Sequence, residues 1–349
     1  MGGVELTAER ARRMRVRSHV LDGSDLEPAA VVQRAIALQG QDLPAVLRAI
    51  AIRSRPGTTV AEVRAAFDTG ALVRSWPMRG TLFATTPEHL AALLHFTSER
   101  THRAAARRRE QLGLTDEVVA RARDVLAEAL AAHPLRRAEA LDLLIEAGID
   151  AVGGRGYHLL MHLCVDGLAH WGPFDDTGTE QLLVRSTTAA PADPDAALAA
   201  VVRGYIAARG PVSETDLAWW TKLPRAALRR AAEAIEDLVE VRVEGSPAWV
   251  VGEPHAPEPS GVILVPGFDE WILGYADRSL VASPAMLDAI VPGGNGVFRP
   301  AVLVDGVAVG TWRASRSARS GPPAVELIER VPAGVRRAIE KAVAAWPHG

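Results

Sequence analysis

The chain has 349 residues, of which 48% are hydrophobic and 23% charged, as in an ordinary globular protein, and its length predicts two or three domains. Its single cysteine, Cys164, excludes an internal disulfide framework and a zinc site built from several cysteines, and it fits a reducing cytoplasm. There is no run of eighteen apolar residues and no apolar stretch near the N-terminus. We therefore expect a cytoplasmic protein with neither a membrane span nor a secretory signal.

Charge is unevenly distributed along the chain. The formal net charge is −3, a balance that argues against nucleic acid as a partner. Residues 1–112, however, contain 17 arginines and 11 acidic residues and carry +6, whereas the rest of the chain carries −9. Lysine occurs only at Lys222 and Lys341, so 37 of the 39 basic residues are arginine, whose planar guanidinium suits phosphate. The first third therefore has the local field of a surface that binds a polyanion.

The first third is predicted to contain helices followed by a strand pair. Apolar spacing and capping signals predict three helices, over residues 28–38, 43–54 and 58–70. Alternating apolar and polar residues then predict a hairpin that turns near Pro77 or Gly80. Three helices followed by a hairpin make a winged helix.

The same order of elements recurs twice, over residues 133–172 and 208–251. Two segments rich in Pro, Ala and Ser, 186–194 and 252–260, are typical of linkers. After the second linker, VILVPGF, WILGY, FRPAVLVDG and VAVGTWRA are predicted strands around glycine-rich turns, and a helix closes the chain. These strands indicate a small β-barrel or half-barrel.

We therefore expect an α+β protein in which three tandem winged helices precede a C-terminal β-barrel-like domain. The predicted domains are a first winged helix with a basic helix (1–112), a second (113–190), a third (191–255), and the barrel-like domain with its terminal helix (256–349).

Gln39, Gly40, Gln41 and Asp42 lie where the first helical pattern breaks. These polar groups either cap the flanking helices, or the two amides hold and polarise a water or a sugar oxygen. Glutamine has no titratable proton acceptor near neutral pH, so such a pair can catalyse only the loss of a leaving group that is already good. Asp42 can supply negative charge near a developing cation.

The predicted hairpin places Trp76 and Arg79 close to its tip, as suits entry into a DNA minor groove, although a core tryptophan beside a surface arginine has the same pattern. Dense basic runs at residues 10–17 and 100–109 either neutralise phosphates or form solvated helix faces. We expect DNA contacts from a set of mostly basic residues: Trp76, Arg79, Thr81, Arg15, Arg17, Arg103, Arg107 and Arg313.

Two further groups of residues have the composition of a site. His158 and His162 are one helical turn apart, with Cys164 close by, a spacing that can bind metal. A helix with this sequence also needs a buried face, and we expect no metal here and no cofactor in the protein. Asp269 and Glu270 are adjacent carboxylates, which we expect to be solvated at a turn or sheet edge rather than to share acid–base chemistry.

Several segments together resemble the AlkZ-like winged-helix DNA glycosylases of bacteria. The resemblance runs from about residue 7 to about residue 340 and rests on LQGQD (38–42), SWPMRGTLF (75–83), DLAWWTKLP (216–224), LVPGFDEWILGYADR (264–278) and VFRPAVLVDGVAVGTWR (297–313). It implies winged helices arranged with a C-terminal barrel around a basic DNA channel. It also implies removal of alkylated purines, including those in interstrand crosslinks made by natural genotoxins, as DNA repair or self-resistance.

In that family a Gln-x-Gln motif is catalytic in the crosslink branch, and it maps onto Gln39 and Gln41. Gly40 departs from the alanine or hydrophobic residue common there, and Phe83 departs from a common histidine. The near absence of lysine argues against a Schiff-base lyase, so we expect a monofunctional glycosylase in which Gln39 and Gln41 position a water and Asp42 lies behind them. We expect a monomer acting on double-stranded DNA with alkylated or crosslinked purines. The alternatives are a non-catalytic winged-helix regulator and a protein-interaction scaffold.

Overall fold

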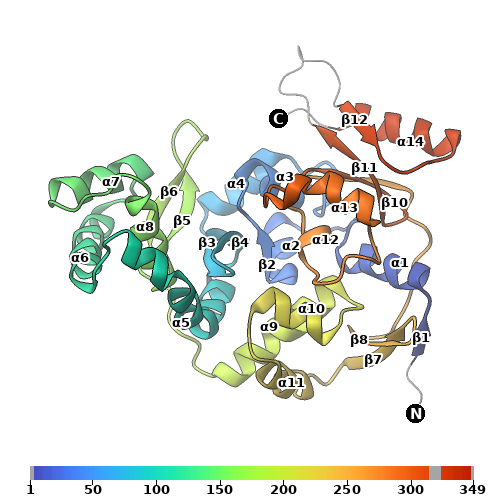
Figure 1. Ribbon diagram of the computed structural model, residues 1–349, viewed down its shortest axis with the longest axis horizontal. Helices are drawn as coiled ribbons and strands as arrows, with labels where there is room; N and C mark the ends of the chain where they lie inside the picture. Colours follow the sequence, from blue (N-terminus) through green and yellow to red (C-terminus); the bar gives the residue numbers. More distant parts are fainter. Residues whose placement is uncertain (1–3, 314–323, 347–349) are drawn as a thin grey trace.

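The structure is a computed structural model that describes residues 4–313 and 324–346. Within these residues a set of three helices followed by a β-hairpin occurs three times, and a four-stranded sheet with its own helices follows (Figure 1). Each set has the order of elements predicted for a winged helix. None of the described helices has the length and apolar character needed to cross a membrane.

The first set lies at the centre of the molecule in Figure 1 and follows helix α1 (Ala8–Ser18). Its elements are α2 (Pro28–Ala35), β2 (Ala37–Gln39), α3 (Leu43–Ala51), α4 (Val60–Asp68), β3 (Val73–Met78) and β4 (Thr81–Thr85). Thr59 and Glu62 form a capping box at the start of α4. The predicted hairpin is confirmed, with Arg79 and Gly80 at its turn at φ 56° and 67°, the conformation that two-residue hairpin turns require.

The predicted helix over residues 28–38 is shorter than expected, because Ile36 has φ 66° and ends it. The next three residues form β2, which pairs antiparallel with β4 and brings Gln39 opposite Phe83. The chain therefore enters the Gln39–Asp42 segment from a strand and not from a helix.

The second set extends the same sheet. The long helix α5 (Pro87–Gln111) leads into it, and its elements are α6 (Asp116–Ala132), α7 (Arg137–Glu146), α8 (Arg155–Val165), β5 (Ala169–Phe174) and β6 (Gln181–Arg185). Arg74 of β3 pairs with Trp171 of β5, so that one five-stranded sheet has the order β2-β4-β3-β5-β6. This sheet runs across the domain boundary predicted at residues 112 and 113.

The third set forms the lower right of Figure 1. It consists of α9 (Pro194–Arg209), α10 (Glu214–Thr221), α11 (Arg225–Glu233), β7 (Leu238–Val243) and β8 (Ser246–Val251). An N-terminal strand that was not predicted, β1 (Val4–Leu6), pairs in parallel with β7. Strand β1 thus belongs to the same sheet as the hairpin of the third set.

Of the two expected alternatives for the C-terminal part, a barrel and a half-barrel, the described residues exclude the closed barrel. It contains β9 (Val262–Val265), α12 (Glu270–Leu273), α13 (Pro284–Ile290), the 3₁₀ turn η1 (Pro292–Gly294), β10 (Ala301–Val304), β11 (Val307–Arg313), β12 (Ala324–Leu327) and α14 (Ala333–Ala344). The sheet has the order β12-β11-β10-β9, and its two outer strands are not paired with each other in the described chain, so it stays open. The segment WILGY, predicted as a strand, begins in helix α12, because Asp269 caps that helix.

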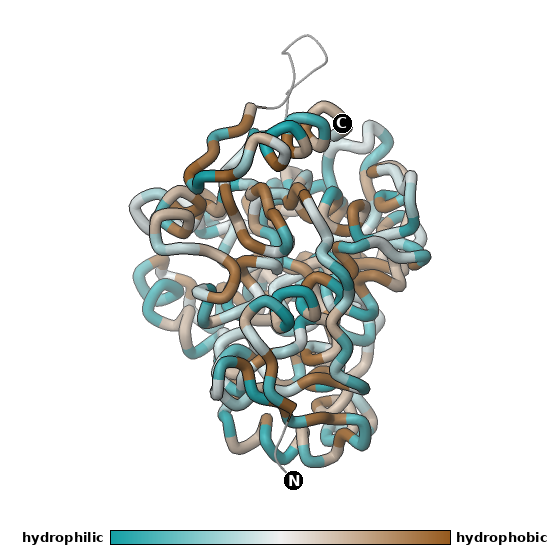
Figure 2. The backbone as a smooth tube through the Cα atoms, turned by 90° about the vertical axis from the view of Figure 1, so that its right-hand side faces the viewer, coloured by the Kyte–Doolittle hydropathy of each residue, from teal (hydrophilic) through white to brown (hydrophobic). Residues whose placement is uncertain are grey.

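Apolar side chains pack in several clusters around these sheets. Figure 2 shows hydrophobic segments running through the interior and hydrophilic ones around the outside, with β1 and α14 at opposite ends. The cluster beneath the second set includes Trp76 from β3 as well as Leu126 and Leu160. The first two sets are therefore joined by a shared core in addition to a shared sheet.

Candidate active site

Gln39 ends strand β2, and its side chain is fixed from two directions. Only 7% of the residue is exposed. Its Nε2 donates to Thr81 Oγ1 at 3.3 Å, and its Oε1 accepts from the backbone N–H of Gln41 at 3.1 Å. Thr81, which we expected to contact DNA, thus orients the Gln39 amide. Gln39 in turn holds the backbone of the motif in its turn.

Gln41 is the exposed member of the pair. Its Oε1 accepts from the backbone N–H of Leu82 at 3.3 Å, and its side chain lines a cavity. Asp42 is also exposed and caps α3, because its Oδ1 accepts from the N–H of Ala45 at 2.9 Å. The two interpretations of this motif therefore apply to different residues: Asp42 caps a helix, whereas Gln41 presents its amide to a cavity.

Gly40 lies against strand β4 without room for a side chain. Its N–H donates to Leu82 O at 2.7 Å, and a Cβ at this position would lie 3.0 Å from Ala84 N and 3.1 Å from the carbonyl carbon of Phe83. These are backbone atoms of a paired strand, so they cannot rotate away. Gly40 therefore allows the motif to approach β4 closely enough for both glutamines to bond with it.

Gly40→Ala is expected to lower the free energy of unfolding by about 1–3 kcal/mol, the usual cost of overpacking a close contact. Urea denaturation of the two proteins measures this difference. The matched control is Gly334→Ala in the first turn of α14, where the nearest atom lies 4.0 Å from the added Cβ. There alanine is expected to be neutral or to stabilise by up to about 1 kcal/mol. Equal effects at the two glycines would contradict the role given to Gly40.

The cavity beside Gln41 has a volume of about 430 Å³ and lies between the first two helix–hairpin sets. Its polar and charged wall comprises Gln41, Asp42, Arg74, Arg137, Thr179, Glu180 and Gln181, and its aromatic wall comprises Trp76, Tyr157 and Trp171. Arg74 Nε donates to Gly40 O at 2.6 Å, and its Nη1 donates to Gln181 Oε1 at 3.2 Å. Burial lowers the pKa of Arg74 to about 10, which leaves it charged at neutral pH. The cavity thus combines amides, both signs of charge and flat apolar surfaces.

Asp269 and Glu270 are buried, which corrects the expectation that they are solvated. Asp269 forms two hydrogen bonds with Arg53, at 2.7 and 2.8 Å. Glu270 Oε2 accepts from Arg209 Nη2 at 2.8 Å and from Trp220 Nε1 at 2.9 Å. Both ion pairs are nearly inaccessible to solvent. The alternation of faces expected for a strand does not apply, because these residues begin helix α12.

Arg209 connects this buried pair to the Gln39 strand. Its Nη1 donates to Ala35 O at 3.0 Å and its Nη2 to Ala37 O at 2.9 Å, on either side of the bend at Ile36. Glu270 thus neutralises the arginine that fixes the backbone leading into Gln39. Sequence reasoning missed Arg209, because an arginine in the last turn of a helix is an ordinary feature and nothing local marks it as buried.

Three of the residues expected on DNA are turned into the protein. Trp76 is 2% exposed and its Nε1 donates to Tyr157 OH at 3.2 Å, so it is a core residue and not a groove wedge. Arg15 is buried, donates to Pro211 O and lies 3.9 Å from the ring centre of Tyr275. Arg79 lies between the rings of Phe83 and Trp219, and burial lowers its pKa.

The remaining basic candidates are accessible. Arg103 and Arg107 lie one turn apart on α5, and the Arg103 side chain is 68% exposed although it pairs with Glu99. Arg17 is exposed and lies 3.1 Å from Asp22, and Arg313 is exposed at the end of β11. These four arginines lie on three different elements, α1, α5 and β11, and do not form a single patch. Helix α5 carries two of them.

The structure places His158, His162 and Cys164 in three different surroundings, so they do not form one site. Cys164 is completely buried in the second core, and burial raises its pKa. His158 lines a separate cavity with Arg79 and Gly80. His162 instead meets His102 and Asp166, a group that sequence reasoning missed because His102 lies sixty residues away on α5.

Comparison with known proteins places this chain among DNA glycosylases. A family model described as DNA glycosylase AlkZ-like matches residues 32–347, so the chain belongs to the AlkZ-like DNA glycosylase family, whose members hydrolyse N-glycosidic bonds. An interstrand DNA cross-link repair glycosylase of Streptomyces sahachiroi is 27% identical over 269 residues, which cover 69% of this chain and 70% of that protein. The solved structure of Streptomyces sahachiroi DNA glycosylase AlkZ matches with a TM-score of 0.78 at 23% identity, covering 98% of this chain and 96% of that chain.

Proposed function

We propose that this DNA glycosylase excises N7-alkylated purines from double-stranded DNA by hydrolysis, and that crosslinked guanines are among its substrates. The observation that carries the proposal is the amide pair, in which Gln39 fixes the turn and Gln41 faces the cavity. Neither side chain can remove a proton from water near neutral pH. The pair therefore suits a base that leaves readily without strong acid–base assistance.

Alkylation at N7 supplies such a leaving group, because the purine then carries a positive charge that weakens its bond to the sugar. The Gln41 Oε1 that accepts from Leu82 has a second lone pair with which to accept a hydrogen bond from water. The water oxygen forms a bond to C1′ while the C1′–N9 bond breaks. The electron pair of that bond leaves with the neutral alkylpurine, and a proton passes from the water to solvent. Asp42 and Glu180 on the same cavity wall supply negative charge toward the oxocarbenium-like sugar.

The distribution of lysines favours hydrolysis over lyase chemistry, which needs an amine nucleophile at the reacting carbon. Lys222 and Lys341 are the two lysines of the chain. Lys222 ends helix α10 and lies 5.2 Å from the ring centre of Trp219, and neither lysine lines the Gln41 cavity. The product expected is an intact strand with an abasic site.

Crosslinked guanine is proposed as a substrate because the Streptomyces sahachiroi relative is an interstrand DNA cross-link repair glycosylase. A base tied to the opposite strand cannot rotate out of the helix in the usual way. The enzyme must then act on the duplex held along its surface, and the exposed arginines of α5 suit phosphate contacts. Membership of a glycosylase family favours an enzyme over the two alternatives, a non-catalytic winged-helix regulator and a protein-interaction scaffold.

The test is excision from a duplex oligonucleotide that contains one N7-methylguanine or one bis-guanine crosslink, followed by alkaline cleavage of abasic sites. Cleavage at the modified position only after alkali supports a monofunctional glycosylase. Strand cleavage without alkali would contradict the hydrolytic assignment. A protein that releases other damaged bases but neither of these would contradict the proposed substrate class.

Arg103→Ala/Arg107→Ala is expected to weaken duplex binding to a similar extent for any sequence, because phosphate contacts carry no base information. The slope of log affinity against log salt should fall by about one for each phosphate that the variant no longer neutralises. Fluorescence anisotropy over a salt series measures both quantities. The control is Arg337→Ala on α14, at the far end of the molecule in Figure 1. An unchanged salt slope in the α5 variant would contradict its placement on DNA.

A further inference from the structure

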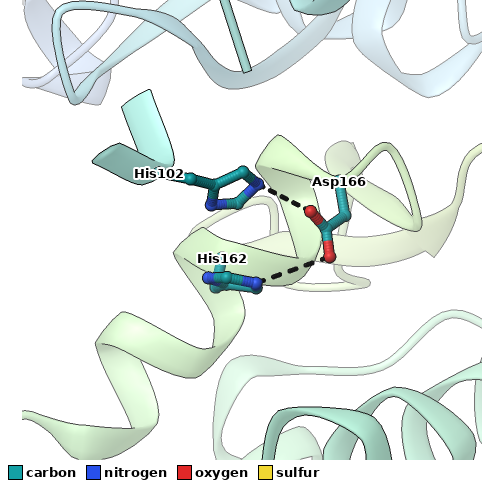
Figure 3. Close-up of side chains that lie close together, drawn as sticks. All are labelled: His102, His162 and Asp166. Atoms are coloured by element: carbon teal, nitrogen blue, oxygen red, sulfur yellow. Dashed lines mark hydrogen bonds and ion pairs between the residues drawn. The ribbon is translucent and has the colours of Figure 1, made fainter. Parts of the chain in front are cut away.

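Three side chains from two helices converge outside the cavity of Gln41. Figure 3 shows His102 of α5 and His162 of α8 next to each other, both facing Asp166, which directly follows α8. His102 Nε2 lies 2.6 Å from Asp166 Oδ1, and His162 Nε2 lies 3.6 Å from Asp166 Oδ2. One ligand atom from each residue falls within 4.8 Å of the other two. Two imidazoles and a carboxylate therefore present their ligand atoms to the same small space.

The geometry of this space suits a small cation. Tetrahedral zinc with bonds of about 2.0–2.1 Å separates its ligand atoms by about 3.3 Å, which lies within the range found here. The two imidazole rings are 4.1 Å apart between centres and tilted by 41°. The side chains are 14–26% exposed, so the group is partly shielded and still open to solvent. A water can then complete the coordination.

We propose that His102, His162 and Asp166 bind one Zn²⁺ ion, which joins helix α5 to helix α8. The donor set of two imidazole nitrogens and one carboxylate is one that zinc accepts. His162 and Asp166 are one turn apart at the end of α8, so one helix presents two ligands on the same face. None of the three residues lines the Gln41 cavity, so the ion is structural with respect to the glycosylase site.

Two arginines place positive charge beside the three proposed zinc ligands. Arg123 forms an ion pair with Asp166, and Arg109 also adds positive charge near His162. The Arg123 side chain is 40% exposed and can turn into solvent when an ion takes its place. Metal binding therefore exchanges an arginine ion pair for coordination.

The experiment uses the untagged full chain, stripped of metal with a chelator and titrated with Zn²⁺ in competition with a chromophoric chelator. We expect one equivalent to bind, with a rise in melting temperature, and His102→Ala and His162→Ala each to weaken binding at least tenfold. Co²⁺ in place of Zn²⁺ should give visible absorption bands that both variants lose. The matched control is His95→Ala, an exposed histidine on the same helix α5, which should bind as the unmodified protein does.

Several outcomes would overturn the proposal. Absence of stoichiometric binding is one, and unchanged affinity in His102→Ala is another. A loss in His158→Ala with none in His102→Ala would show that the ion binds the histidine pair on α8 alone, and would also overturn it. Circular dichroism establishes that each variant is folded, and Asp166→Asn gives a second test of the carboxylate ligand. Binding is measured without DNA, so the result is independent of the glycosylase proposal.

Discussion

Glu270→Ala is expected to lower the free energy of unfolding by about 3–5 kcal/mol, because it leaves the buried Arg209 guanidinium without its carboxylate. Arg209 is 1% exposed and cannot recover water without opening the core. Trp220 Nε1 loses an acceptor as well. Since native proteins are stable by about 5–15 kcal/mol, this is a large part of the total. Urea denaturation followed by fluorescence measures the change.

The control for this prediction is Glu258→Ala, an exposed glutamate for which a change within about 0.5 kcal/mol is expected. If Glu270→Ala does not accumulate as folded protein, Glu270→Gln keeps the shape and a partner for Trp220 while it removes the charge. A loss below about 1 kcal/mol in both Glu270 variants would show that the ion pair does not hold these elements together.

Gln39→Ala/Gln41→Ala is expected to reduce single-turnover excision of N7-methylguanine by about 100-fold or more while leaving duplex affinity unchanged. The reason is that the reaction depends on the orientation of a water, and a misplacement of about 1 Å has effects of that size. Gln39→Ala alone removes the hydrogen bonds to Thr81 and to the turn, so it should reduce excision through Gln41. Gln41→Ala alone removes the amide that faces the cavity.

Gln111→Ala, an exposed glutamine at the end of α5, is the matched control for the pair. It is expected to excise at the rate of the unmodified enzyme. Excision that persists in a folded Gln39→Ala/Gln41→Ala protein would contradict the site assignment, although the enzyme would remain a glycosylase. A loss of duplex affinity equal to the loss of rate would assign the pair to binding instead of chemistry.

The repeated helix–hairpin sets could be predicted because their signals are local. Caps such as Thr59 and turns such as Arg79–Gly80 are determined by a few adjacent residues. The joint sheet could not be predicted, since β2 is three residues long and the pairing of Arg74 with Trp171 has no local signature. The sequence could not decide between a barrel and a half-barrel for a related reason, because closure depends on the pairing of the outer strands and not on the strands themselves.

In the site, the Gln39–Gln41 pair could be identified from its motif, but the buried residues that hold its backbone in place could not. Spacing cannot say whether a side chain points inward, so Trp76 and Arg15 were placed on DNA although both are buried. Arg209 and Glu270 lie far from Gln39 in the sequence and carry the charges that patterns assign to the surface. Buried ion pairs of this kind become visible only when the fold brings their partners together.

The link from Glu270 through Arg209 to strand β2 also joins residues that are made at very different times during translation. Gln39 is made early in translation, but the carboxylate that neutralises Arg209 is added 231 residues later. At about 5–20 residues per second, this delay is about 10–50 s. During that time Arg209 lacks the Glu270 carboxylate, so the hydrogen bonds that hold the β2 backbone are incomplete in the nascent chain. A ribosome-bound fragment that ends before Glu270 is therefore expected to excise less N7-methylguanine than the released full chain does.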